Sequence, residues 1–317
     1  MRNRDGVIAR VGGLPGVAIR LTRKAVAKWL VENHGPIGSA FRTTPTFFPL
    51  IGGSLVEGLM TIGSDLDFCM MVDGKVTELE VGALQPGFRR SMSELDSTLK
   101  RTGLSGLCRV SRRIRITDGF LGLQRGQEPR AGVLRTGVRL NFVLSCELLD
   151  TGVDGRELHV RLADERALRE LKRRLYGNYR RALGHSFIPV LAYVLKRPGS
   201  YTPSRWAAQV QLAVDDLALA MHGVEGISGT VYEKAPRVVG SMGVHGPVAV
   251  REAFRSSFDL IRHLKRQAST DARIRRKSFN YLVSKGYIGK ESWRRACRLS
   301  RWLLCALEGS GQMGDPA

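Results

Sequence analysis

Two carboxylates close behind a glycine-serine turn are the residues with the clearest chemical potential. Gly53 and Ser54 follow a short apolar stretch, and Asp65 and Asp67 stand two positions apart within a second apolar stretch. Because side chains alternate faces along a strand, both aspartates are expected to point the same way. Such a carboxylate pair suits Mg²⁺ or Mn²⁺, whose coordination is often completed by the oxygens of a substrate phosphate. The spacing therefore predicts a metal site with Asp65 and Asp67 as catalytic ligands.

The turn supplies the groups that a polyphosphate would need. Gly53 lets the backbone approach a ligand closely, and Ser54 offers both a hydroxyl and an N–H group. An ordinary surface hairpin would also contain Gly-Ser and Ser-Asp pairs, which are common in loops. The large apolar residues that alternate with Asp65 and Asp67 argue against that alternative, because a solvated hairpin has no need of them. We interpret the motif as a functional site.

The order Gly53-Ser54, ten intervening residues and then Asp65-Leu66-Asp67 resembles the motif of the nucleotidyltransferase superfamily. That superfamily includes DNA polymerase beta, poly(A) polymerases, terminal uridylyltransferases and the oligoadenylate and cyclic-dinucleotide synthases. The similarity covers about residues 17–73 and does not select a branch. It implies an α/β (α+β) catalytic domain with a mixed sheet, followed by an α-helical domain.

The resemblance also implies an activity. A nucleoside monophosphate would move from a nucleoside triphosphate to an acceptor hydroxyl, with two metal ions stabilising the attacking and leaving oxygens. Gly53, Ser54 and Ser64 would contact the triphosphate. A lysine that ends an early helix of the second domain often does so as well, and Lys196 stands at a comparable place. A cation facing the dipole at a helix C-terminus explains Lys196 equally well.

A third carboxylate, which the resemblance implies on a later strand, is hard to find. The apolar stretch over residues 137–145 is predicted as that strand, with Asn141 at the position of the acid. A neutral amide is a weaker ligand than a carboxylate and is no general base. We take Asn141 as the positional equivalent, which leaves slow, altered or lost catalysis open. Asp118, Glu147 and Asp150 are the alternatives, although turn sequences surround Asp118 and Asp150.

Basic charge is concentrated toward the end of the chain. There are 50 Lys and Arg against 29 Asp and Glu, a formal net charge of +21, and residues 251–302 hold fifteen of the basic and four of the acidic residues. Cations alternate there with aromatic residues, as in surfaces that neutralise phosphates and stack on bases. For the aromatics Phe279, Tyr281, Trp293 and Trp302, a core position in amphipathic helices is the favoured interpretation.

The charge excess itself predicts a polyanionic partner. We expect RNA to be the partner and the acceptor, bound through Arg273, Arg275, Arg276, Lys277, Arg294 and Arg295. A rival enzyme hypothesis transfers the nucleotide to a small molecule, a second nucleotide or a protein. The hypothesis outside the enzyme class is a catalytically degenerate transferase fold that binds nucleic acid or acts as a scaffold, and Asn141 favours it.

Periodicity predicts the elements that must position these residues. We expect a catalytic domain over residues 1–155, a basic helical domain over 156–308 and a disordered tail over 309–317. The predicted helices cover residues 18–31, 88–101, 162–179, 187–196, 204–222, 250–267 and 292–308; the predicted strands cover 47–50, 66–72, 108–117 and 137–145; and residues 223–247 are predicted as a Gly- and Ser-rich loop.

Cysteine and targeting signals predict an intracellular, cytoplasmic chain. The five cysteines show neither C-x-x-C spacing nor a paired framework, which is typical of reduced thiols; Cys69, Cys108 and Cys146 are expected as small core residues. The arginine-bearing, acid-poor residues 1–24 weakly resemble a mitochondrial transit peptide, but helical apolar spacing favours a structural helix there. Apolar runs are too short to span a membrane, so no membrane partner is expected.

Overall fold

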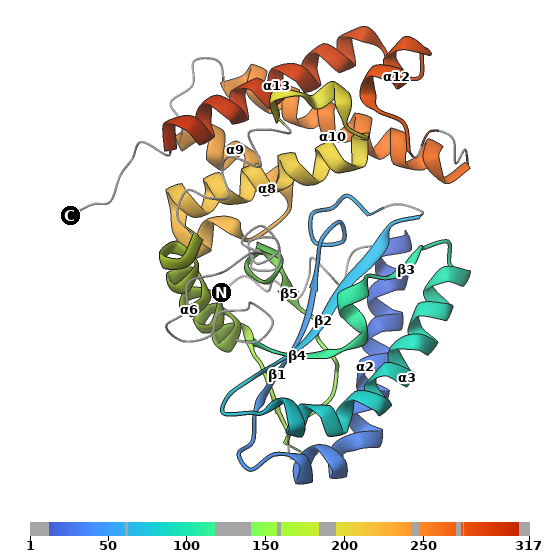
Figure 1. The fold of residues 1–317 in the computed structure, drawn as a ribbon, viewed down its shortest axis with the longest axis vertical. Coiled ribbons are helices and arrows are strands. Elements are labelled where there is room, and N and C mark those ends of the chain that lie inside the picture. The colour runs from blue at the N-terminus through green and yellow to red at the C-terminus, as the bar shows by residue number, and fades with distance from the viewer. Residues whose placement is uncertain are drawn as a thin grey trace, which may run out of the picture. The chain divides into compact units, whose positions relative to one another are not determined.

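The computed structural model describes residues 13–60, 63–117, 141–156, 160–183, 195–241, 247–270, 274 and 276–310 (Figure 1). The chain divides into two compact units. The first comprises Met1–Val56, Met60–Glu128 and Cys146–Arg174, and the second comprises Glu57–Leu59, Pro129–Ser145 and Leu175–Ala317. The expected domain break near residue 155 therefore falls within a stretch that belongs to the first unit. The tripeptide Glu57–Leu59, which follows the glycine-serine turn, belongs to the second.

The first unit is a mixed α/β structure around a six-stranded sheet. β1 (Thr46–Gly52) and β2 (Asp65–Asp73) form its antiparallel centre, with Thr46 opposite Asp73 and Gly52 opposite Asp67. The two strands predicted around the turn are thus confirmed. Short strands extend both edges: β3 (Gly106–Leu107) and β4 (Ile114–Ile116) pair with β2 in parallel, β5 (Glu147–Leu148) pairs with β1 antiparallel, and β6 (Arg161–Leu162) pairs with β1 in parallel.

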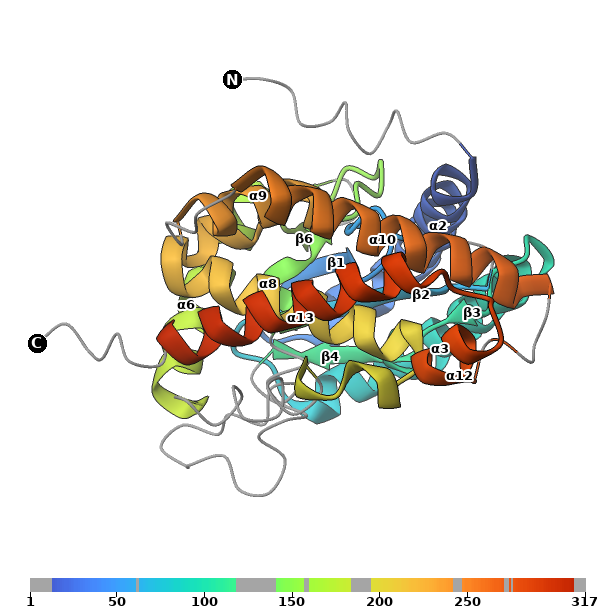
Figure 2. The same ribbon diagram turned by 90° about the horizontal axis from the view of Figure 1, so that it is seen from above.

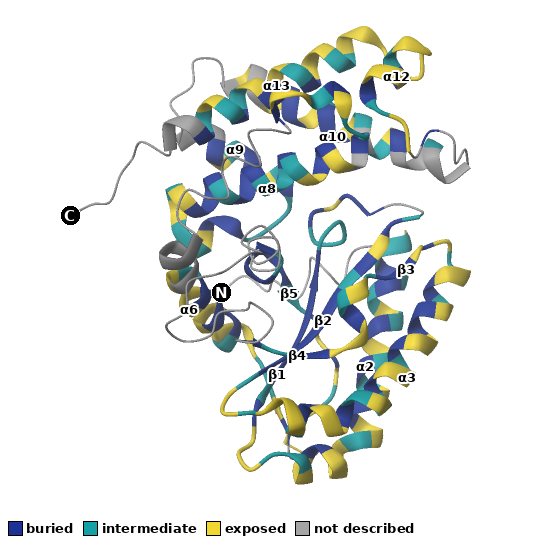
Figure 3. Cartoon of the chain, viewed as in Figure 1, coloured by how far each residue is buried: buried dark blue, intermediate teal, exposed yellow. Residues whose placement is uncertain are grey.

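Helices α2 (Gly13–Ala40) and α3 (Glu78–Arg101) pack together and against the central strands. Trp29 of α2 meets Phe88 of α3 edge to face, with ring centroids 5.0 Å apart. A capping box starts α3, since the Thr77 side chain accepts from Glu80 N and Glu80 Oε2 accepts from Thr77 N at 2.7 Å. Figure 3 marks β1 and the middle of β2 as buried, so the sheet forms the core of this unit.

Of two predicted strands of the first half of the chain, one is confirmed only in part and the other is wrong in its described part. Residues 108–117 form the 3₁₀ helix η1 (Arg109–Arg112) followed by β4, because Ser111 turns back onto β2 and its Oγ donates to Phe68 O at 2.6 Å. Residues 141–145 are helical, and residues 137–140 lie outside the described residues. A short apolar run cannot be distinguished from a buried helical turn by periodicity alone.

The described part of the second unit is helical. Figure 2 shows α10 and α13 side by side, and both contact the central helix α8. Trp206 Nε1 donates to Ser300 Oγ at 2.8 Å, which joins α8 to α13 through the core. The elements are α6 (Glu165–Leu183), which begins in the first unit, η3 (Pro198–Ser200), α8 (Pro203–His222), η4 (Gly223–Ile227), α9 (Val231–Ser241), α10 (Pro247–Thr270), α12 (Phe279–Ser284) and α13 (Lys290–Ser310).

The helices expected over residues 162–179, 204–222, 250–267 and 292–308 are confirmed by α6, α8, α10 and α13. Most of the helix expected over 187–196 lies outside the described residues. Of the expected disordered tail, residues 309 and 310 belong to α13 and the rest lie outside the described residues. In the part of the chain that the structure describes, no helix is long and apolar enough to cross a membrane.

The loop expected over residues 223–247 is wrong in part, because η4 and α9 form there. Val231, Ala235 and Val238 recur at helical spacing and are all buried. Glu233 completes the helix start by accepting from Thr230 N at 2.7 Å. Burial of this stripe and the capped start outweigh the turn-forming composition of the surrounding sequence.

Candidate functional site

The Asp67 carboxylate lies directly against Gly53 of the turn. Gly52 ends β1 opposite Asp67, and Gly53 follows with a φ of +59°. A Cβ atom at Gly53 would overlap the Asp67 carboxylate, so a glycine is needed there both for its conformation and for its size. The structure therefore brings these two members of the sequence motif together.

Asp65 shares the face of β2 that carries Asp67, since the two residues alternate with buried Leu66. Asp65 is exposed and Asp67 is half-buried, as is Ser54 in the turn. Ser64, in contrast, is buried, and its carbonyl accepts from Ser105 N at 3.0 Å. The backbone of Ser64 thus fixes the start of β2.

Asp96 of α3 holds the strand that flanks Asp65. Gly106 of β3 pairs with Asp65, and Asp96 Oδ1 accepts from the neighbouring Leu107 N at 2.7 Å. Lys100 Nζ and Arg112 Nη2 lie 2.6 and 3.1 Å from Asp96 Oδ2. Burial alone would raise the pKa of Asp96, but these hydrogen bonds and cations hold it below its usual value. The ionised carboxylate therefore supports the edge of the sheet.

Three thiols lie near the carboxylate pair. Cys69 follows Asp67 on the same face of β2. Cys108 N donates to the carbonyl of Leu66, the residue before Asp67, at 3.0 Å. Burial, and then the charge of Asp67, raise the pKa of Cys108. Burial also raises the pKa of Cys69 and that of Cys146, the latter to about 12. Thiols that stay protonated are poor nucleophiles and metal ligands. Cys69 and Cys146 are core residues as predicted, whereas Cys108 is half-buried.

Of the candidates for a third carboxylate, Glu147 and Asp150 are described, and neither continues the carboxylate pair of β2. Glu147 of β5 pairs with Ile51, which pairs with Phe68, so strand alternation places Glu147 on the opposite face from Asp67. One further step of the register places Cys146 beside Gly52. Asp150 forms a turn as its sequence predicted, with Oδ1 accepting from Gly152 N at 2.8 Å, and its Oδ2 lies 3.2 Å from Arg23.

Asn141 lies in the second unit, in the helical stretch described above, so the strand argument for its role as third ligand is wrong. Asp118 lies outside the described residues. Among the described residues, no three His, Cys, Asp or Glu side chains form a group that could hold a metal ion. The donor set of Asp65 and Asp67 fits one hard cation that also binds a substrate phosphate. It does not by itself provide the carboxylates of a two-metal site.

Lys172 is a buried cation next to the sheet that the sequence did not single out. It lies on α6, and its Nζ donates to Cys146 O at 2.6 Å. The neighbouring arginines of α6, Arg169 and Arg173, are exposed. In the sequence Lys172 is one cation among several on an amphipathic helix, and only packing distinguishes it.

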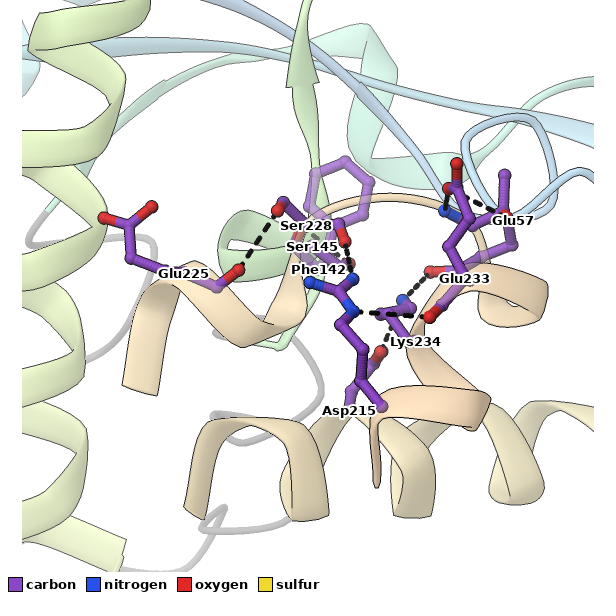
Figure 4. Close-up of polar contacts among 10 residues, drawn as sticks. Glu57, Phe142, Ser145, Asp215, Glu225, Ser228, Glu233 and Lys234 are labelled. Atoms are coloured by element: carbon purple, nitrogen blue, oxygen red, sulfur yellow. Dashed lines mark hydrogen bonds and ion pairs between the residues drawn. The ribbon is translucent and has the colours of Figure 1, made fainter. Parts of the chain in front are cut away.

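A buried charge cluster holds the residues that follow the turn. Lys234 of α9 lies 2.5 Å from both Glu57 Oε1 and Asp215 Oδ1, and the three side chains are fully buried (Figure 4). Burial, and then the charge of Asp215, raise the pKa of Glu57 to about 8. Burial alone would lower the pKa of Lys234, but the two carboxylates raise it above its usual value. We call these three residues the charge triad.

The charge triad lies wholly within the second unit. Leu59 belongs to the apolar core of that unit, and Arg262 Nη2 donates to Gly58 O at 3.3 Å. None of the three triad residues was predicted from the sequence. Asp215 offered a signal, because it interrupts an apolar stripe of α8 between Val214 and Leu217. Lys234 fell in the predicted loop and offered none.

The predicted RNA-binding cations divide into two groups. Arg273 and Arg275 lie outside the described residues. Arg276, Lys277, Arg294 and Arg295 are exposed, as is Lys196. On α13, Arg294 and Arg295 lie 3.7 and 3.4 Å from Glu291, so their charge is partly balanced.

Compared with known proteins, the chain matches no family model and no curated protein. The chemistry of the site therefore has to be inferred from its own residues. These offer a glycine turn that admits no side chain beside Asp67, a carboxylate pair on one face of β2, and no third acid beside them among the described residues. Such a set can bind a cation together with a polyphosphate.

Proposed function

We propose that the chain is a metal-dependent nucleotidyltransferase that moves a nucleoside monophosphate from a nucleoside triphosphate to an acceptor hydroxyl, with RNA as the acceptor. The observation that supports it most is the placement of the Asp67 carboxylate directly over Gly53, with Asp65 on the same face of β2. A surface hairpin would have no reason to exclude every side chain at Gly53. A turn that presents its N–H groups to phosphate beside two metal-binding carboxylates would.

Asp65 and Asp67 would hold Mg²⁺ or Mn²⁺. When bound, the ion would neutralise triphosphate charge and orient the reacting phosphate. Gly53 and Ser54 would bind the phosphates through backbone N–H groups and the Ser54 hydroxyl, while buried Ser64 would keep the start of β2 in place. Ser64 thus serves the site through its backbone.

A second candidate function is a catalytically degenerate transferase fold that binds nucleic acid or acts as a scaffold. The two carboxylates on one face of β2 fit a single hard cation with a bound phosphate, which suits triphosphate binding without transfer. A third candidate, transfer to a small molecule, nucleotide or protein, keeps the same catalytic residues and differs in the acceptor alone.

Purified full-length chain should be incubated with each labelled nucleoside triphosphate and Mg²⁺ or Mn²⁺, with and without RNA. We expect extended RNA, and we expect the double variant Asp65→Ala, Asp67→Ala to lose it while remaining folded. Glu94→Ala is the matched control, because Glu94 is an exposed acid on α3 of the same unit. Labelled small products would favour the third candidate. Triphosphate binding without any product would favour the degenerate fold.

A further inference from the structure

Two tyrosines beside α12 are exposed, although the other described aromatic residues of the second unit are buried or half-buried. Tyr281 is 40% exposed and Tyr287 is 41% exposed, whereas Phe279 is fully buried. The interpretation of all the C-terminal aromatics as core residues is therefore wrong for Tyr281. Two part-exposed tyrosine rings only six residues apart offer flat apolar faces with a polar hydroxyl at the edge.

The rest of α12 is firmly anchored. Phe279 packs against Trp206 and Trp293, with ring centroids 5.5 and 4.9 Å apart, and its N–H donates to Tyr201 O at 3.0 Å. Leu282, on the same side of the helix, is also fully buried. Tyr281 thus sits on a rigid support and presents its ring away from the core.

Four exposed cations lie in the same stretch of sequence as these two rings. Lys277 Nζ lies 4.9 Å from the centroid of the Tyr281 ring, and Lys285 stands one helical turn further on. Arg276 and Lys290 are exposed as well, and no Asp or Glu occurs from residue 274 to residue 290. Among the described residues, none of these four cations forms an ion pair, in contrast to Arg294 and Arg295 on α13.

We propose that residues 276–290, which we call the α12 surface, form a docking site for single-stranded RNA, with Tyr281 and Tyr287 as stacking platforms. Unstacked bases can stack on exposed aromatic faces, and the surrounding lysines neutralise phosphates. A duplex hides its base faces and could use only the charges. This inference rests on the proposed function, because it states where the RNA acceptor would be held.

The test compares binding of the full-length chain to a labelled single-stranded RNA, to a duplex of the same sequence and to heparin, which carries charge without bases. Tyr281→Ala and Tyr287→Ala should each weaken single-stranded RNA binding roughly 5- to 100-fold and leave heparin binding unchanged. Tyr281→Phe should retain most of the affinity, since its ring still stacks. Leu79→Ala, which shortens an 86% exposed side chain on α3, is the matched surface control.

Charge is tested separately. Changing Lys277 and Lys285 to Ser should weaken both RNA and heparin binding, and should flatten the log–log salt dependence of RNA binding by roughly 1.4, about 0.7 for each phosphate that is no longer neutralised. Thermal melts of each variant establish that it is folded. Photocrosslinking with 4-thiouridine RNA, followed by mass spectrometry, should identify Tyr281 or Tyr287.

Three outcomes would overturn the proposal that the α12 surface binds single-stranded RNA. They are no RNA binding by the wild type at low salt, tyrosine variants that bind single-stranded RNA normally, and an equal loss of heparin and RNA binding in those variants. Failure of the proposed reaction is seen independently. Asp65→Ala with Asp67→Ala should abolish nucleotide transfer and leave RNA binding intact, whereas Tyr281→Ala should leave triphosphate binding intact.

Discussion

Lys234 Nζ lies 2.5 Å from Glu57 Oε1, and Glu57 stands only three residues after Ser54 of the glycine-serine turn. Glu57–Leu59 belongs to the second unit, while the chain on either side of it belongs to the first. The segment that follows the turn is therefore fixed by a buried hydrogen bond from Lys234 to Glu57 and by the packing of Leu59 in the helical core. Changes in the charge triad should therefore alter the free energy of unfolding.

Lys234→Met should lower the free energy of unfolding at pH 7 by about 3–5 kcal/mol, because it leaves the buried Asp215 carboxylate without its cation and the protonated Glu57 without its hydrogen-bond donor. Urea denaturation measures the effect. Adding Glu57→Gln and Asp215→Asn to the same chain should recover part of the loss, since no buried charge is then left unpaired. Lys285→Met changes an exposed lysine of the same unit and should shift stability by less than about 0.5 kcal/mol. Equal stability of Lys234→Met and wild type would show that the triad is dispensable.

Glu57 should make the wild type less stable as the pH rises from about 4.5 to about 8. Its pKa is about 8 in the folded chain against the usual 4.5, so across this window the folded state keeps a proton that the unfolded state loses. The free energy of unfolding should fall by up to about 1.4 kcal/mol per pH unit there. Glu57→Gln should match the wild type near pH 4.5, remove this slope and be the more stable protein at pH 9. The free energy of unfolding of both proteins is measured by denaturation at a series of pH values. If it changes with pH in the same way in both, Glu57 is not the group responsible.

Gly53→Ala should lower the proposed nucleotide transfer by roughly 10²-fold, because the new methyl group displaces the Asp67 carboxylate, the proposed metal ligand. Gly63→Ala is the control: Gly63 also has a positive φ, of 77°, but a Cβ atom there meets open space. Both variants should lose some stability through backbone strain, and Gly53→Ala alone should lose activity to this extent. Equal kinetic losses would assign the effect to strain.

Asp96→Asn should lower the free energy of unfolding by about 1–3 kcal/mol at neutral pH, because the charged acceptor for Lys100, Arg112 and Leu107 N is replaced by a neutral one. The pKa of Asp96 is held below its usual value, so its contribution is present above that value and is lost as the pH falls through the lowered pKa. The difference between wild type and Asp96→Asn should accordingly shrink in acid. Thermal melts between neutral and acidic pH test this, and a difference that grows in acid would exclude the proposed role.

Local patterns were enough to predict the centre of the first unit. The apolar runs around the turn yield β1 and β2, and the i, i+2 spacing of Asp65 and Asp67 places them on one face, because alternation is a property of every strand. The long helices α8, α10 and α13 follow from apolar spacing for the same reason. At residues 141–145 and in α9, burial rather than periodicity sets the secondary structure. The predicted strand and the predicted loop were therefore wrong there.

The sequence by itself determined the carboxylate pair, the glycine turn and the basic excess, since each depends on residue types and short spacings. Only the tertiary structure decided which charges are buried and which aromatics are exposed. Glu57 and Lys234 are 177 positions apart, and nothing in their own surroundings marks them as partners. Phe279 and Tyr281 are two residues apart, yet one is in the core and the other in solvent. Burial is set by what packs against a residue, and those contacts come from distant parts of the chain.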